Sequence, residues 1–269
     1  MSKVESVESV VSHDGTTIAY EQSGAGPALI LIGGAFGERT SAAGMAALLA
    51  PRFTVFAYDR RGRGGSGDTQ PYAVEREVED LEALIDRAGG AAFVYGHSSG
   101  AALAIEASAE GLPIGRLVLY EPPYIVDQGR APIPPDFESR LRAAVAAGRP
   151  GDAVEAFWEV ALQMPPQAIA DARKAPFWPH LESLAHTLPY DQAIVAPHQA
   201  GRPLPAEWAR QITLPTLVLD GGGSAAYMRN AVAAVAELLP NAERRTIPGQ
   251  GHGAPPDVMA PIITEFLER

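Results

Sequence analysis

Short apolar runs of strand length alternate along this chain with longer segments whose apolar residues recur at helical spacing. The runs at 28–32, 53–58, 92–95 and 116–120 are almost wholly apolar, which is typical of strands buried on both faces of a sheet. Helical spacing lies between them, for example at 73–88. The alternation therefore predicts a mostly parallel sheet covered by helices.

The same pattern predicts the two ends of the chain and an interruption in its middle. The predicted elements are an opening hairpin at 3–12 and 16–22, further strands at 215–219 and 243–247, and further helices at 225–239 and 257–268. From 124 to 210 the strand rhythm stops, and helical stretches are predicted at 136–147, 151–163 and 178–187. We therefore expect a core formed by 1–123 and 211–269, with 124–210 inserted as a helical cap.

Composition narrows the possible partners of the chain. The 269 residues carry a formal charge of -11, a field that repels phosphate backbones and argues against a nucleic-acid partner. No apolar run reaches the ~20 residues that span a bilayer, so no membrane partner is expected. The N-terminus lacks the apolar region of a signal peptide, which predicts a cytoplasmic protein. The basic cluster at 60–63 (Arg-Arg-Gly-Arg) is interpreted as a structural turn rather than a binding patch.

The absence of cysteine limits the chemistry. With no cysteine in the sequence, disulfides, thiolate metal sites and cysteine nucleophiles are excluded. The three glycines at 221–223 are not followed by the Gly-Lys-Ser/Thr of a phosphate-binding loop. We expect neither a metal nor a cofactor.

A serine motif stands where a strand is followed by a helix. Residues 96–100 (Gly-His-Ser-Ser-Gly) fit G-x-S-x-G, and the motif follows an apolar strand and precedes an alanine-rich helix. The glycines at its ends are needed because the turn brings the strand and helix backbones close together. Ser98 is the predicted nucleophile.

A serine hydroxyl needs a neighbouring base to remove its proton. Of the six histidines, His252 lies in a glycine-rich loop (Gly-Gln-Gly-His-Gly) after the last predicted strand and before the closing helix. The other five lie in a hairpin turn, beside Ser98 or in the cap. His252 is therefore the predicted base.

These features together resemble the α/β-hydrolase superfamily. The resemblance rests on the order of elements, Gly-Gly at 33–34, the loop at 59–66, the serine turn and the histidine loop. It implies an α/β-hydrolase fold, with a mostly parallel eight-stranded sheet flanked by helices and a helical cap insertion. Its motifs are specific for the fold and carry little information on the substrate.

The acidic member of the catalytic triad departs from the usual pattern. Superfamily members usually carry it in the loop after the strand at 215–219, where the position falls at about Ser224, which cannot stabilise an imidazolium. Asp220 is nearby, at the predicted strand end. In other members the acid follows the preceding strand, where Glu121 stands. The sequence at 96–101 combined with Glu121-Pro-Pro is similar to zearalenone-type lactone hydrolases, so Glu121 is favoured and Asp220 is the alternative.

The resemblance also implies the oxyanion donors, while the large side chains near the cap are candidates either for the substrate pocket or for the core of the cap. Two backbone N–H groups are expected to face the developing oxyanion, those of Ser99 and Ala35, with Gly34 as the alternative to Ala35. The residues expected to contact substrate are Gly34, Phe36, Trp158 and Trp178.

The predicted function is hydrolysis of a carboxylic ester or lactone through an acyl-enzyme on Ser98, with a small molecule as the partner and a monomer or homodimer as the assembly. The alternatives within the fold are C–C bond hydrolysis, perhydrolysis or transfer to an alcohol. Dehalogenases and epoxide hydrolases of this fold are disfavoured, because they use aspartate where this chain has Ser98. Outside catalysis, the alternatives are a ligand-binding protein that retains the triad and a degenerate structural protein.

Overall fold

The computed structural model describes residues 6–209 and 211–269, so residues 3–5 of the predicted first strand lie outside the described part. The strands are β1 (Glu8–Val11), β2 (Thr17–Ser23), β3 (Ala28–Ile32), β4 (Thr54–Tyr58), β5 (Ala92–His97), β6 (Ile114–Tyr120), β7 (Thr216–Gly221) and β8 (Ala242–Ile247). They form one eight-stranded sheet in the order β1-β2-β4-β3-β5-β6-β7-β8. β2 runs antiparallel to both β1 and β4, and the remaining pairs are parallel. The predicted fold class is confirmed.

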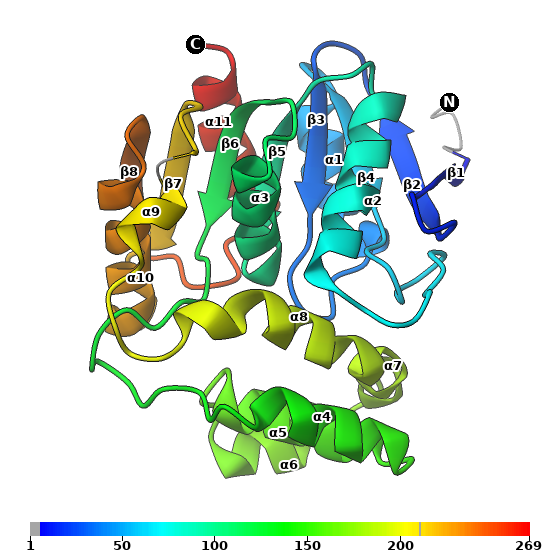
Figure 1. The fold of residues 1–269 in the computed structure, drawn as a ribbon, viewed down its shortest axis with the longest axis vertical. Coiled ribbons are helices and arrows are strands. Elements are labelled where there is room, and N and C mark those ends of the chain that lie inside the picture. Colours follow the sequence, from blue (N-terminus) through cyan, green and yellow to red (C-terminus); the bar gives the residue numbers. More distant parts are fainter. Residues whose placement is uncertain (1–5, 210) are drawn as a thin grey trace.

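Helices cover both faces of this sheet (Figure 1). One face packs against α2 (Val74–Arg87), α3 (Ser99–Ala109) and α10 (Ala226–Leu238), through side chains such as Leu81, Leu103 and Val232. The other face packs against α1 (Ala43–Leu49) and α11 (Pro256–Leu267), through Leu49 and Ile263. Both faces of the central strands are therefore buried, which explains their unbroken apolar runs.

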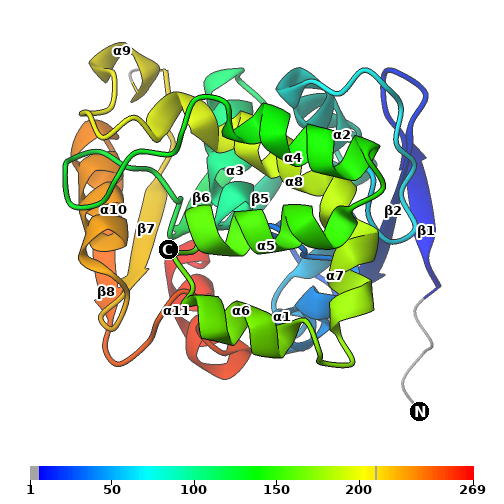
Figure 2. The same cartoon turned by 90° about the horizontal axis from the view of Figure 1, so that it is seen from below.

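A layer of helices crosses the carboxyl ends of the parallel strands (Figures 1 and 2). These helices are α4 (Phe137–Ala146), α5 (Pro150–Val160), α6 (Pro166–Ala172), α7 (Trp178–Leu184) and α8 (Leu188–Val195). All of them fall within the predicted insertion at 124–210. They have their own apolar centre, which includes Phe137, Val154, Trp178 and Leu188.

After α8, a short helical turn (Ala196–His198) and α9 (Ala206–Ala209) lead back to β7 of the core. The sequence pattern did not predict three helices of seven or eight residues, namely α1, α6 and α8. Across residues 6–209 and 211–269, no helix combines the length and the apolar character needed to cross a membrane.

Candidate active site

Ser98 lies on a sharp turn between β5 and α3. Its backbone torsions are φ 57° and ψ -124°, a conformation that a residue with a Cβ rarely adopts. The Ser98 N–H donates to the carbonyl of Tyr120 on the neighbouring strand, at 2.9 Å. The turn is therefore fixed from β6 and holds the hydroxyl at the carboxyl edge of the sheet, as the sequence motif predicted.

The glycines of the motif are required by close backbone contacts. A Cβ on Gly96 would lie 2.5 Å from the carbonyl oxygen of Gly100, and a Cβ on Gly100 would lie 2.5 Å from the carbonyl oxygen of Ile32. Backbone atoms cannot move aside as a flexible side chain can. The predicted reason for these two glycines is confirmed.

Strand register brings Glu121 next to Ser98. In the parallel pair β5 and β6, His97 pairs with Tyr120, so the residues that follow them leave the sheet side by side. Glu121 has a positive φ of 50°, and its N–H donates to the carbonyl of Leu219 on β7 at 3.1 Å. The carboxylate is thus directed to the edge of the sheet where the parallel strands end.

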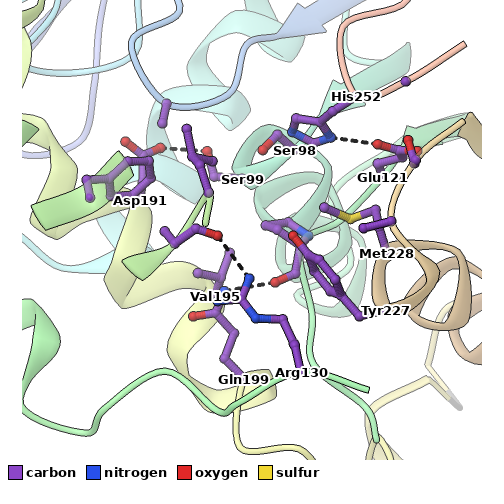
Figure 3. Close-up of a pocket in the computed structure, with 18 of the residues that line it drawn as sticks. Ser98, Ser99, Glu121, Arg130, Asp191, Val195, Gln199, Tyr227, Met228 and His252 are labelled. Carbon is purple, nitrogen blue, oxygen red and sulfur yellow. Dashed lines mark hydrogen bonds and ion pairs between the residues drawn. The ribbon is translucent and has the colours of Figure 1, made fainter. Parts of the chain in front are cut away.

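His252 bonds to Glu121. Its Nδ1 lies 2.7 Å from Glu121 Oε2, and Glu121 Oε1 accepts the Gly221 N–H at 2.8 Å. Burial alone would raise the pKa of the Glu121 carboxyl, but the lowering influences, of which the hydrogen bond with His252 is the strongest, together outweigh burial and hold its pKa below the ordinary 4.5. Glu121 is therefore ionised at neutral pH, and since a carboxylate only accepts hydrogen bonds, the His252 proton is on Nδ1. Figure 3 shows the Ser98 side chain beside the imidazole.

Two aromatic side chains fix the histidine loop. His97 Nε2 donates to the carbonyl of His252 at 2.8 Å, and the Tyr120 hydroxyl donates to the carbonyl of Gly251. Burial, together with the positive charge that His252 can carry, lowers the pKa of His97 to about 4. His97 therefore stays neutral and holds the loop.

Asp220 is directed elsewhere. Asp220 lies inside β7, one residue before the end of that strand. The sequence pattern had predicted that the strand ends at residue 219. Its Oδ2 accepts two hydrogen bonds from Arg244 on β8, at 2.6 and 2.9 Å. The structure therefore brings Glu121, rather than Asp220, to His252.

The two expected oxyanion donors flank Ser98. Ser99 is the first residue of α3, where an N–H has no partner within the helix. Ala35 follows β3, and both Ala35 and Ser99 line the same cavity as Ser98. Arg63 donates to the carbonyl of Gly34 at 2.7 Å. The Gly34 carbonyl and the Ala35 N–H belong to one trans peptide group and point in opposite directions, so the Ala35 N–H is turned away from Arg63. A Cβ on Gly34 would lie 2.8 Å from Ser98 Cβ, so glycine is needed where this loop passes the serine.

The three arginines of the 60–63 cluster are buried and bonded within the fold. Arg60 is paired with Glu77 at 2.6 Å, and Arg61 is paired with Asp80 at 2.7 Å. Arg60 and Arg63 both donate to Asp191 of α8, each at 2.7 Å. These contacts agree with the interpretation of the cluster as a structural turn.

Asp191 connects the cap to both oxyanion loops. Its Oδ1 accepts the Ser99 hydroxyl at 2.6 Å, and its Oδ2 accepts Arg63, which holds Gly34. Asp191 is 1% exposed and is buried against two arginines. The Asp191 carboxylate thus contacts the side chain of Ser99 and also Arg63, which holds the loop that carries Ala35.

A cavity of about 350 Å³ opens in front of Ser98, between the core and the cap (Figure 3). Its volume is at the lower end of the range for ligand pockets, which suits a small substrate. Its apolar wall consists of Phe157, Leu162, Val195 and Met228. Its polar lining, besides Ser98, Ser99, Glu121 and His252, includes Arg130, Asp191, Gln192, Gln199, Ser224 and Tyr227.

The predicted substrate contacts lie outside this cavity. Trp158 and Trp178 pack edge-to-face on each other at 5.5 Å between ring centroids, within the apolar centre of the cap. Gly34 and Phe36 line a neighbouring cavity on the other side of the loop, and Phe36 packs on Phe157 at 5.8 Å. None of these four residues lines the cavity in front of Ser98, although Gly34 lies directly beside the serine.

Sequence reasoning missed Asp191 and Arg130. Asp191 lies in a short helix that the pattern did not predict, and Arg130 lies in an irregular segment after β6. One signal was available for Asp191. Three arginines close together in an apolar, acidic protein need carboxylates if they are buried, and some of these had to come from distant segments.

Comparisons with known proteins identify relatives of this chain. A solved alpha/beta hydrolase from Sphaerobacter thermophilus is 51% identical, with a TM-score of 0.90, covering 97% of this chain and all of the other. The 2-(acetamidomethylene)succinate hydrolase of Mesorhizobium japonicum is 26% identical over 94% of this chain and 92% of its own length. The N-formylmaleamate deformylase of Pseudomonas putida is 35% identical over half of this chain, and that match spans 52% of its own length.

The model of the alpha/beta hydrolase family matches residues 24–262. This stretch contains the parallel strands, the serine turn, Glu121 and the histidine loop, together with the inserted cap. The chain belongs to the alpha/beta hydrolase family and is an enzyme of that family.

Proposed function

We propose that this enzyme hydrolyses a carboxylic ester or lactone, with Ser98 as nucleophile, His252 as base and Glu121 as the acid that orients it. The observation that carries the proposal is the 2.7 Å contact between His252 Nδ1 and the buried Glu121 carboxylate, in the cavity that Ser98 lines. With the proton on Nδ1, the Nε2 lone pair of neutral His252 is free to accept the Ser98 proton.

The reaction has two halves. Ser98 Oγ attacks the substrate carbonyl carbon while His252 Nε2 takes the hydroxyl proton, and the oxyanion that forms is bound by the N–H groups of Ala35 and Ser99. The C–O bond to the alcohol then breaks, and His252 returns the proton to the leaving oxygen. Water, deprotonated by His252, attacks the acyl-enzyme and releases the acid and Ser98. Glu121 stays ionised and stabilises the imidazolium in each half.

The names of the curated relatives extend the range of acyl groups worth testing. One is named a hydrolase of an acetamido-substituted succinate and the other a deformylase of an N-formyl compound. The same attack on a carbonyl carbon can release an amine in place of an alcohol. Substrate panels therefore need N-acyl and N-formyl compounds beside esters and lactones.

Fluorophosphonate labelling tests the nucleophile. We expect one adduct on the wild-type protein by intact mass and none on Ser98→Ala, since only a serine next to a working base reacts. The Ser98→Ala change should also lower ester turnover by at least about 10³-fold, because every covalent step is lost. The sequence has no cysteine, so no thiol background arises.

Other outcomes would point to other functions. An adduct on wild type with no turnover of any ester, lactone or N-acyl compound would favour a ligand-binding protein that retains the triad. An equal yield of adduct on Ser98→Ala would overturn the assignment of the nucleophile. C–C hydrolysis or perhydrolysis would be recognised by turnover confined to a diketone or to peroxide-dependent assays.

A further inference from the structure

Arg130 is the cationic side chain, apart from His252, among the residues that line the Ser98 cavity. We propose that it binds a carboxylate of the substrate, so that this enzyme acts on small esters, lactones or amides that carry an acid group. The inference rests on the proposed function, because it concerns the same cavity. In Figure 3 Arg130 and Tyr227 lie on the side of the pocket away from His252.

The charges of the cavity support an anionic ligand. Its lining holds two carboxylates, and both are neutralised within the protein: Glu121 is bonded to His252, and Asp191 is bonded to Arg60 and Arg63. Within the described part of the chain, the groups that accept hydrogen bonds from Arg130 are backbone carbonyls. The cavity therefore contains one permanent cation that no carboxylate neutralises, in a chain whose formal charge is -11.

The guanidinium is held in place and still has donors free. It donates to the carbonyl of Val160 at 2.7 Å, to that of Ala161 at 2.9 Å and to that of Ala131 at 3.3 Å. A guanidinium has five N–H donors, so two are left for a ligand. Its Cζ lies 4.7 Å from the centre of the Tyr227 ring, which fixes the plane of the group. Less side-chain freedom remains to be lost when an anion binds.

The same contacts connect Arg130 to the reaction space. Ala161 and Tyr227, which hold the guanidinium, themselves line the cavity. Phe157, Leu162, Val195 and Met228 supply its apolar wall. A fitting substrate has its carbonyl at Ser98, a short hydrocarbon middle, and a carboxylate that reaches Arg130. Such a molecule is a half-ester, lactone or N-acyl derivative of a small acid.

A matched pair of esters tests this directly. We would compare mono-p-nitrophenyl glutarate with p-nitrophenyl butyrate on wild type, Arg130→Gln and Arg130→Lys. The expected result is a ratio of kcat/KM, anionic over neutral ester, that falls about 10- to 100-fold in Arg130→Gln, the usual effect of losing a charge-assisted hydrogen bond. Arg130→Lys should fall less, because the charge stays while the planar pair of donors is lost. The control is Arg149→Gln, an equal change of charge at an exposed cap residue that pairs with Asp152.

Binding without turnover separates this proposal from the proposed function. Ser98→Ala should bind glutarate in calorimetry, and Ser98→Ala/Arg130→Gln should not, whether or not any ester is cleaved. If the double variant loses glutarate binding and the wild-type protein cleaves no ester or lactone, the anion site is supported and the ester or lactone activity is rejected. An equal fall in kcat/KM for both esters, or the same glutarate affinity with and without Arg130, would show that Arg130 only caps the end of α5. If Arg130→Gln does not fold, Arg130→Lys and its glutarate affinity decide the matter by the same criterion.

Discussion

Backbone torsions mark the candidate site at the scale of single residues. Phe36, Ser98 and Glu121 have φ values of 60°, 57° and 50°, in the left-handed region that side chains disfavour. Phe36 lies in the loop that carries Ala35, Ser98 is the proposed nucleophile and Glu121 is the proposed acid. Such torsions cost about 1–3 kcal/mol each and persist where surrounding contacts enforce them, most often at functional sites. Ser98 and Glu121 take part in the proposed mechanism and Phe36 neighbours Ala35, whereas a fourth residue with positive φ, Gln163 at 54°, lies in the cap away from these groups.

Isosteric changes at the two acids test which one serves His252. Glu121→Gln should lower kcat by roughly 10³- to 10⁴-fold, because an amide can neither select the Nδ1 tautomer nor stabilise the imidazolium. Asp220→Asn should keep most of the activity while lowering the Tm, since Arg244 loses its charged partner. Steady-state kinetics with thermal melts on both variants provide the measurement. Activity that survives in Glu121→Gln and is lost in Asp220→Asn would return the acid to β7.

At the scale of elements, α8 fastens the cap to the catalytic edge of the sheet. Its Asp191 accepts hydrogen bonds from Arg60, Arg63 and Ser99, all of them buried. Arg63 in turn holds the loop after β3 through the Gly34 carbonyl. A helix of the insertion thereby contacts the supports of both candidate oxyanion donors, so cap position and oxyanion geometry are coupled.

Asp191→Asn tests this coupling. Leaving two buried arginines short of a carboxylate should cost about 3–5 kcal/mol of unfolding free energy. Displacement of the Ala35 and Ser99 N–H groups should lower kcat more than it raises KM, because these groups act on the transition state. Asp152→Asn, which removes an exposed carboxylate paired with Arg149, is the control. A variant that is less stable but retains full kcat at a temperature where it is folded would limit Asp191 to a structural role.

At the scale of the whole molecule, burial of titratable groups makes stability depend on pH. The pKa of His97 is about 4 in the folded protein against an ordinary 6.5, because burial disfavours its charged form. The pKa of Asp191 is lowered because the attraction of Arg63 and Arg60 outweighs its burial. At these two groups, therefore, the unfolded chain binds more protons than the folded one as the pH falls, beginning with His97 at about pH 6.5.

The free energy of unfolding should accordingly fall as the pH drops from about 6.5 to about 4, as His97 becomes protonated in the unfolded state first. Below that range, protonation of Asp191 and Glu121, whose folded pKa values are lowered, should remove further stability. Urea denaturation at intervals between pH 7 and pH 4 measures the slope. His97→Gln should have a shallower slope, and a slope equal to that of wild type would exclude His97 as a source.

The sequence by itself determined the local parts of this protein. The serine turn was predictable because strand, turn and helix are contiguous, and because the glycines are required by backbone contacts within and beside that turn. The buried strands were predictable because a strand covered on both faces must be apolar throughout. The position of His252 was predictable because it follows the last strand, and the carboxyl ends of parallel strands lie at one edge of the sheet. The sequence favoured Glu121 but left Asp220 open, and the structure directs Glu121 to His252 and Asp220 to Arg244.

Only the tertiary structure decided what lines the cavity and what supports the site. Trp158 and Trp178 pack on each other rather than face Ser98, because short cap helices take their orientation from packing and not from their own periodicity. Asp191 reaches Arg63 across 128 positions of sequence, and Arg130 meets Tyr227 through the way the cap lies on the core. Such contacts depend on how separate elements are placed against one another, a property that no local pattern of residues contains.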